Sequence, residues 1–268
     1  MANLECFINI AKLMRIREWW TKLLIFFAAA MIMVIWNENT GNFFGSLIFM
    51  FVYGVFTGSY GYIINSYFDR RADEQINKYP VVRYFRKNQL ILVLAILGSL
   101  TFLMPFYFHI PEVAAIGLAI FFLTTFYSAP PLRLKERSIL GPLAVAFAHR
   151  PLPFLLFTFL IPPNAILTLF LFGWLILIGL PPIIGHQMLD FENDMKTGIT
   201  TMVTSVGLST AYKITLSLVC VSFLYILLAP VLFGLVHGFA LTLTLFVFAG
   251  TDLSFHIFQP KNNIAPDS

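Results

Sequence analysis

The sequence predicts an all-α integral membrane protein: a bundle of about eight transmembrane helices, with a polar cytoplasmic cap over a central cavity. Three observations support this fold class. Hydrophobic residues make up 59% of the 268 positions and charged residues 11%, whereas a soluble domain carries about 25% charged residues. The apolar residues gather in runs that approach the ~20 residues needed to cross a bilayer. The polar segments between these runs alternate between short and long, as expected when successive loops lie on opposite sides of a membrane.

We expect a single domain over residues 1–268, in contact with membrane lipids and with no nucleic-acid partner. The N-terminal segment has no short apolar core followed by a small-residue cleavage site, so the first span is expected to remain in the protein. Cys6 and Cys220 lie far apart, which gives no basis for a disulfide framework or a metal cluster. The predicted spans cover roughly residues 20–36, 43–64, 89–108, 112–128, 139–160, 165–187, 209–230 and 231–256.

Basic residues predict the orientation of the bundle. All Lys and Arg residues except Arg150 fall in the N-terminal segment, in segments 65–88, 129–138 and 190–213, or in the C-terminal tail. The positive-inside rule places these segments and both termini in the cytoplasm. Arg150 lies about ten residues into the fifth span, roughly 15 Å deep. A charge at that depth needs a partner or a function, and Asp252 in the eighth span is the partner we expect.

Two acidic clusters follow apolar spans on the predicted cytoplasmic side. In NSYFDRRAD, a spacing of four places Asn65, Asp69 and Asp73 on one face of a helix. In HQMLDFENDMKTG, Asp190 and Asp194 repeat that spacing after the sixth span. Carboxylates at a helix end are often simply solvated, but two such clusters facing one compartment favour a binding site.

The chemistry suited to two facing carboxylate clusters is the binding of a divalent cation with a phosphorylated substrate. Mg²⁺ takes oxygen ligands and is usually held by one or two carboxylates together with substrate phosphates. Two clusters would hold a diphosphate between them, and the metal would neutralise the charge on a departing pyrophosphate. An apolar groove between helices rich in Phe and Met suits an isoprenoid chain.

A third segment, YSAPPLRLKERS at residues 127–138, lies in the predicted cytoplasmic loop after the fourth span. With this segment and the two acidic clusters, the chain resembles the UbiA superfamily of intramembrane prenyltransferases over most of its length. The superfamily patterns Asn-x3-Asp-x3-Asp, Tyr-Ser-x-Pro-Pro-x-Arg-x-Lys and Asp-x3-Asp stand here in the same order, at matching helix ends.

The resemblance implies an Mg²⁺-dependent enzyme that acts on an isoprenoid diphosphate and a lipophilic acceptor. The implied metal ligands are Asn65, Asp69, Asp73, Asp190 and Asp194. The catalytic groups expected on this basis are the four aspartates and Tyr127. The residues expected to contact substrate are Asn65, Lys22, Arg70, Arg83, Arg133, Lys135 and His186.

The chain departs from the superfamily pattern at three places. The stretch after the first motif has no Ser-Gly pair, and its arginine is displaced to Arg83. Eight predicted spans stand where members usually have nine. His149 and Arg150, inside the fifth span, belong to none of the quoted motifs.

Several alternatives stay open at this stage. Transfer is favoured over cyclisation, because a moderately polar set is predicted near the acceptor: Tyr127, Ser128, His186, Gln187 and Asn193. The acceptor we expect is an aromatic quinone precursor, and a tetrapyrrole alcohol ester, a glycerol phosphate and a sugar phosphate also stay open. A cyclase that acts on the diphosphate alone would use the same metal site, and a non-catalytic lipid-binding or transport protein is the third alternative. Individual groups also have simpler explanations. Tyr127 would serve as an interfacial anchor, the basic residues of the 129–138 loop as topology determinants, and His186 as a packing residue.

Overall fold

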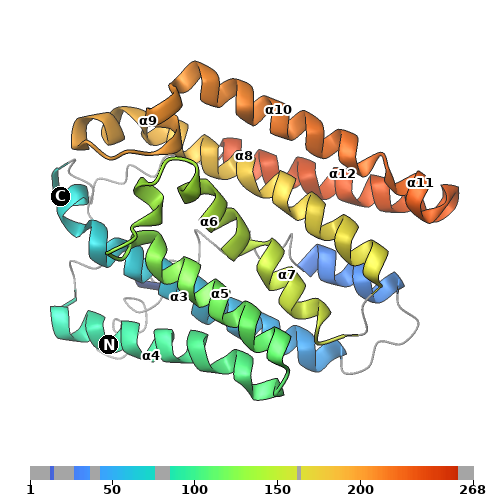
Figure 1. The fold of residues 1–268 in the computed structure, drawn as a ribbon, viewed down its shortest axis with the longest axis horizontal. Coiled ribbons are helices and arrows are strands. Elements are labelled where there is room, and N and C mark those ends of the chain that lie inside the picture. The colour runs from blue at the N-terminus through green and yellow to red at the C-terminus, as the bar shows by residue number, and fades with distance from the viewer. Residues whose placement is uncertain (1–12, 15–26, 37–42, 76–84, 162–163, 259–268) are drawn as a thin grey trace, which may run out of the picture.

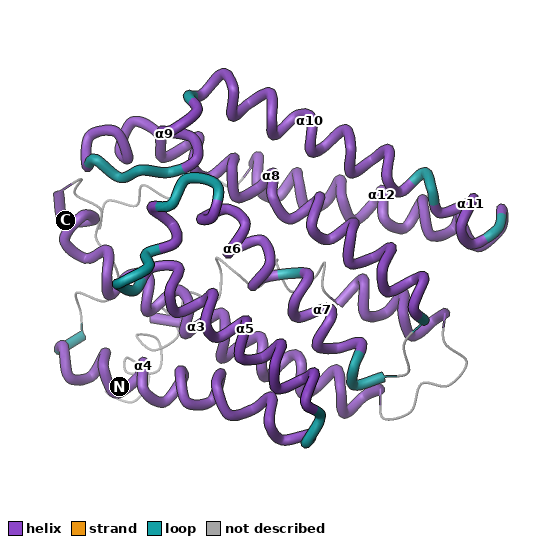
Figure 2. The backbone as a smooth tube through the Cα atoms, in the orientation of Figure 1, coloured by secondary structure: helices purple, strands orange, loops and turns teal. Residues whose placement is uncertain are grey.

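The structure is a computed structural model that describes all residues except 1–12, 15–26, 37–42, 76–84, 162–163 and 259–268, and only the backbone of 71–75 and 251–258. In the described part every regular element is a helix (Figures 1 and 2), and one isolated parallel bridge joins Ser138 to Thr201. The predicted all-α membrane fold is therefore confirmed. The elements are α3 (Phe43–Gln75), α4 (Lys87–Leu103), η2 (Met104–Phe108), α5 (Pro111–Ser128), η3 (Leu134–Glu136), α6 (Leu140–His149), α7 (Pro151–Thr158), α8 (Ala165–Thr197), α9 (Met202–Val206), α10 (Leu208–Ile226), α11 (Ala229–Phe233) and α12 (Leu235–Phe258).

The helices identify a multi-pass membrane protein. Within the described residues, six stretches are long and apolar enough to cross a bilayer, and two shorter apolar helices cover Phe27–Trp36 and Leu235–Gly250. These stretches fall on the eight predicted runs. The count of eight spans itself stays a prediction, because the first and last runs extend outside the described residues or are shorter than a full span.

Helix α8 organises the bundle. It packs against α10 on one side and against α6 and α7 on another, while α3 packs against α4 and α5. In Figure 1, α10 and α12 lie along one side, α3, α4 and α5 along the other, and α8 runs between them with α6 and α7. The side chains of Leu171, Trp174 and Ile178 in α8 are completely buried. Phe154 and Phe157 of α7 belong to the same apolar core.

Two helices are longer than the membrane requires, and this determines where the site lies. Helices α3 and α8 each have 33 residues, or about 50 Å at 1.5 Å per residue, whereas the hydrocarbon layer is about 30 Å thick. Their carboxyl-terminal turns therefore extend beyond the apolar layer. Both ends lie at the same end of the bundle, on the left in Figure 1.

The fifth predicted span is interrupted. The sequence predicts one helix over roughly 139–160, but α6 ends at His149 and α7 begins at Pro151. Arg150 between them has non-helical dihedral angles, φ −135° and ψ −68°. The cause is local: Pro151 and Pro153 supply no backbone N–H, and a proline disfavours the helical conformation of the residue before it.

The connection between the two final helices is unusually tight. The short helix α11 and Gly234, with φ +78°, turn the chain from α10 into α12. A Cβ added to Gly238 would lie 2.2 Å from the Cα of Pro230 and 2.5 Å from the carbonyl oxygen of Ala229. Because both atoms belong to the backbone, no side-chain rotation relieves that contact.

We therefore expect Gly238→Ala to destabilise the protein by about 1–3 kcal/mol through overpacking. The measurement is the melting temperature of the purified protein in detergent. Gly250→Ala in the same helix is the matched control, because an added Cβ meets nothing within 4 Å there. An equal melting temperature for Gly238→Ala and the wild type would show that α11 and α12 do not pack this closely.

Candidate functional site

The first acidic cluster lies at the carboxyl-terminal end of α3, where α3 is aligned with α5. The hydroxyl groups of Tyr60 and Thr125 are 3.0 Å apart, within hydrogen-bond distance. One turn further on, Ser128 Oγ donates a hydrogen bond to Asn65 Oδ1 at 2.5 Å. Asn65 and Asp69 are half-buried on the same helix face, as the spacing of four predicts.

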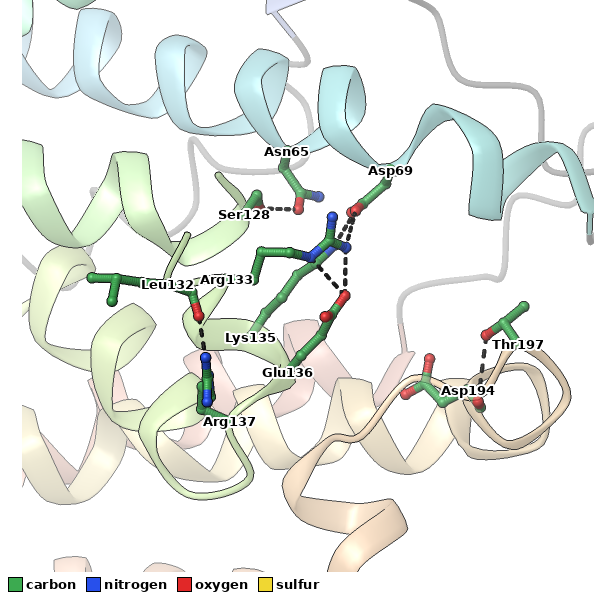
Figure 3. A network of polar contacts seen from close by, with 10 residues as sticks. All are labelled: Asn65, Asp69, Ser128, Leu132, Arg133, Lys135, Glu136, Arg137, Asp194 and Thr197. Carbon is green, nitrogen blue, oxygen red and sulfur yellow. Dashed lines mark hydrogen bonds and ion pairs between the residues drawn. The ribbon is translucent and has the colours of Figure 1, made fainter. Parts of the chain in front are cut away.

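The loop after α5 brings two cations to Asp69 (Figure 3). Lys135 Nζ forms an ion pair with Asp69 Oδ1, and Arg133 Nη2 lies 3.7 Å from the same oxygen. The side chains of Lys135 and Asp69 are only 12% and 15% exposed. Water therefore screens this pair weakly, and each charge depends on the other for compensation.

Glu136 holds the guanidinium group of Arg133 in place, a role that sequence analysis missed. Arg133 Nε donates to Glu136 Oε1 at 2.9 Å, and Nη2 contacts the same oxygen. The backbone of Arg133 is left-handed, with φ 41°, at the point where the loop enters η3. The only available signal in the sequence was the spacing of three between the arginine and the glutamate. That spacing is uninformative without knowledge that a 3-10 turn begins there.

The second acidic cluster lies at the end of α8. Asp194 is half-buried, while Asp190 is exposed. The helix ends at Gly198, whose φ of +70° suits glycine, and the Gly198 N–H donates to the carbonyl of Asp194. The Thr197 hydroxyl donates to the Asn193 carbonyl at 2.9 Å.

Tyr127 lies near both clusters. It is close enough to Asp69 of α3 and to Asp194 of α8 for both charges to act on its hydroxyl group. Figure 3 shows Asp69 within the contacts to Arg133 and Lys135, and Asp194 on α8 apart from them. The bridge between Ser138 and Thr201 further ties the loop after α5 to the segment after α8. Residues from three distant parts of the sequence therefore share one end of the bundle.

The remaining predicted residues divide into three groups. Arg70, His186 and Asn193 are described and exposed. Gln187 is buried, and its Oε1 has no hydrogen-bond partner among the described residues. Lys22 and Arg83 lie outside the described residues, as do the side chains of Asp73 and Asp252. The pairing of Arg150 with Asp252 accordingly stays a prediction.

The donor set fits a hard cation bound together with a ligand. Among the described side chains, no three His, Cys, Asp or Glu groups are arranged to hold a metal ion by themselves. Mg²⁺ does not need such a cage, because it usually takes one or two carboxylates, water and phosphate oxygens. The ammonium group of Lys135 and the guanidinium group of Arg133 lie against Asp69. This carboxylate therefore attracts cations, and the two basic groups offer hydrogen-bond donors to an anion.

Comparisons with known proteins agree with this arrangement. A family model described as the UbiA prenyltransferase family matches residues 23–265. A structure of a UbiA homolog from Archaeoglobus fulgidus bound to DMAPP and Mg²⁺ superposes with a TM-score of 0.72 at 16% identity, over 92% of this chain and 85% of that one. The same homolog bound to GPP and Mg²⁺ gives 0.72 at 15% identity, over 96% and 91%.

A third similar structure comes from work on digeranylgeranylglyceryl phosphate synthase in membranes. It has a TM-score of 0.65 and 17% identity, and covers 96% of this chain and 94% of that one. At these identities the structural matches establish a shared fold. No curated protein matches the chain in sequence.

The ion pair between Lys135 and Asp69 gives a direct test of the site geometry. Lys135→Met leaves a largely buried carboxylate with only the more distant Arg133 as its cation, and we expect a loss of up to about 3 kcal/mol, measured as a lower melting temperature. Adding Asp69→Asn should recover much of that loss, because it removes the poorly compensated charge.

Arg137→Met is the control, since Arg137 is exposed and donates to the Leu132 carbonyl rather than to Asp69. Additive effects of Lys135→Met and Asp69→Asn would mean that the two groups do not interact.

Proposed function

The chain belongs to the UbiA prenyltransferase family, and on that premise we propose that it transfers a polyprenyl group from an isoprenoid diphosphate to a lipophilic acceptor. An aromatic quinone precursor is the acceptor we favour. The observation that carries the proposal is the ion pairing of Asp69 with Arg133 and Lys135, at the end of a membrane bundle in which Asp194 of α8 lies at the same end (Figure 1).

Similar folds support the choice of cofactor and substrate class. The homolog structures contain Mg²⁺ with DMAPP or GPP, both of them isoprenoid diphosphates. In this chain the residues proposed to hold Mg²⁺ are Asn65, Asp69, Asp73, Asp190 and Asp194. When bound, Mg²⁺ supplies positive charge that stabilises the pyrophosphate as it leaves.

The basic residues act on the diphosphate itself. Lys135 and Arg133 form ion pairs with Asp69, and a diphosphate bound beside Asp69 gives both of them phosphate oxygens to contact. Glu136 fixes the Arg133 guanidinium, so its donors stay directed toward α3. These contacts strengthen as negative charge develops on the leaving pyrophosphate.

The reaction proceeds by loss of pyrophosphate from the first carbon of the isoprenoid chain. The carbon–oxygen bond breaks with both electrons on the oxygen, and an allylic cation remains. A nucleophilic atom of the acceptor then forms the new bond and releases its proton. The apolar bundle excludes water, which would otherwise capture the cation.

Tyr127 and its neighbours are proposed to orient the acceptor. The Tyr127 hydroxyl lies in the field of both Asp69 and Asp194, and the buried Oε1 of Gln187 is available to a donor on the acceptor. A cyclase would instead need a closed apolar contour. We further propose that residues 1–268 form one domain, with the site and both termini toward the cytoplasm, in keeping with the distribution of Lys and Arg.

The shared metal site predicts that Asp69→Ala and Asp190→Ala each remove most of the turnover, by a factor of about 100 or more. The measurement is Mg²⁺-dependent release of pyrophosphate from GPP and longer isoprenoid diphosphates by purified protein. Glu192→Ala is the matched control, since Glu192 is exposed on the same helix and belongs to neither cluster. Full activity in a folded Asp69→Ala or Asp190→Ala variant would rule out a site shared between α3 and α8.

Substitutions of the residues proposed to contact the acceptor distinguish transfer from cyclisation. We expect Tyr127→Phe and His186→Ala to lower the rate of product formation with acceptor more than they lower acceptor-free pyrophosphate release. Product masses decide the question, after incubation with diphosphates of several lengths in the presence and absence of quinone precursors. A cyclic hydrocarbon or alcohol made from the diphosphate alone, with no acceptor incorporated, would identify a cyclase. Binding of the diphosphate without any pyrophosphate release would identify a lipid-binding protein.

A further inference from the structure

Two proline-containing segments meet at Arg150. The first is the break between α6 and α7, where Arg150 itself occupies the gap. The second is the middle of α8, a continuous helix that contains Pro181 and Pro182. Arg150 is only 3% exposed and stands near the middle of the membrane span Leu140–Thr158.

Pro182 leaves one backbone carbonyl of α8 without its usual donor. In an α-helix the carbonyl of residue 178 accepts from the N–H of residue 182, and proline has no N–H. Within a membrane, water cannot replace that donor, and an unsatisfied carbonyl costs several kcal/mol.

The guanidinium group of Arg150 supplies the missing donor. Arg150 Nη1 donates to the Ile178 carbonyl oxygen at 2.7 Å. Arg150 runs beside Gly179, where an added Cβ would lie 3.6 Å from Arg150 Cδ, an ordinary van der Waals contact, so the approach does not depend on the glycine. The charged group is therefore held against the backbone of α8 at the residue where proline disrupts the hydrogen bonding.

We propose that Arg150 is a positioning residue that fixes the direction of α8 beyond Pro181 and Pro182 and, through it, the location of Asp190 and Asp194 opposite α3. The inference rests on the proposed function in that these carboxylates bind metal and diphosphate. It concerns none of the groups that touch the ligands.

The length of the helix beyond Pro182 makes its direction there consequential. Asp194 lies about 18 Å further along the axis at 1.5 Å per residue, so a change of about 10° in that direction moves its backbone by about 3 Å. A misplacement of about 1 Å already costs on the order of 100-fold in catalysis. Because proline removes hydrogen bonds that hold a helix straight, an unanchored α8 would leave the distance between the two clusters poorly determined.

The first experiment tests the replacement of the donor and does not depend on activity. We expect Arg150→Met to lower the melting temperature by about 5 °C, and adding Pro182→Ala to recover part of that loss by restoring the N–H to Ile178. Pro181→Ala is the control: its N–H would face the carbonyl of residue 177, so its effect on the melting temperature should be the same with and without Arg150. Pro182→Ala should raise the melting temperature more in Arg150→Met than in the wild type, and an equal effect in the two backgrounds would overturn the replacement. If Arg150→Met does not fold alone, the two double variants are compared with each other, and Arg150→Met with Pro182→Ala should melt at a higher temperature than Arg150→Met with Pro181→Ala.

The second experiment tests positioning, by calorimetric binding of GPP in the presence of Mg²⁺. We expect Arg150→Met to weaken binding at least tenfold and Arg150→Lys, which keeps a donor, to weaken it less. Leu156→Ala is the control, since it destabilises the same span through a buried cavity and leaves the Arg150 hydrogen bond in place.

If the loss of GPP affinity simply follows the loss of stability, Leu156→Ala will weaken binding as much as Arg150→Met does. That result would mean that Arg150 has only a structural role. If the wild-type protein binds neither GPP nor a longer isoprenoid diphosphate with Mg²⁺, the proposed function fails and the positioning role fails with it. The melting comparison would still decide whether Arg150 replaces the N–H donor that Pro182 lacks.

Discussion

The membrane interior offers no water to backbone amides, and the structure follows from that constraint. Every regular element in the described part is a helix, because a helix satisfies its own N–H and C=O groups. In the middle of the bundle, prolines disrupt the helical hydrogen bonds. The Arg150 guanidinium there donates to the Ile178 carbonyl, which lacks its usual helical donor. Chemistry that needs charge is therefore displaced to the helix ends, where water is available.

The helix ends make a site only because three segments converge there. Helices α3 and α8 are long enough to carry carboxylates beyond the apolar layer, and the loop after α5 brings basic groups between them. The Tyr60–Thr125 contact and the Ser128–Asn65 hydrogen bond fix the end of α5 against α3. The bridge between Ser138 and Thr201 fixes the same loop against the segment after α8. The polar region is thus formed by the ends of α3 and α8, and the short loop after α5 lies between them.

Sequence alone predicted the fold class and the acidic clusters, because both depend on patterns within one helix. Long apolar runs reveal membrane helices, and a spacing of four reveals a shared face. The sequence did not predict the anchoring of Arg133 by Glu136, because that contact depends on a left-handed backbone at Arg133. It also missed the break at Arg150, although Pro151 was visible, since a continuous apolar run outweighed the proline in locating the fifth span. The hydrogen bond from Arg150 to the Ile178 carbonyl could not be predicted from sequence, because it depends on how two helices far apart in the chain are placed relative to each other.

The hydrogen bond of Arg150 also bears on how the protein is made. A central arginine costs about 2.5–3.5 kcal/mol when a segment enters the membrane through the insertion machinery, and the proline break in Leu140–Thr158 weakens that segment further. The carbonyl that accepts from Arg150 belongs to α8, which the ribosome produces later. The fifth span therefore cannot complete its polar contacts when it first emerges, and its stable insertion is tied to the synthesis of the helix that follows it. We therefore expect α6, α7 and α8 to integrate into the membrane as one unit.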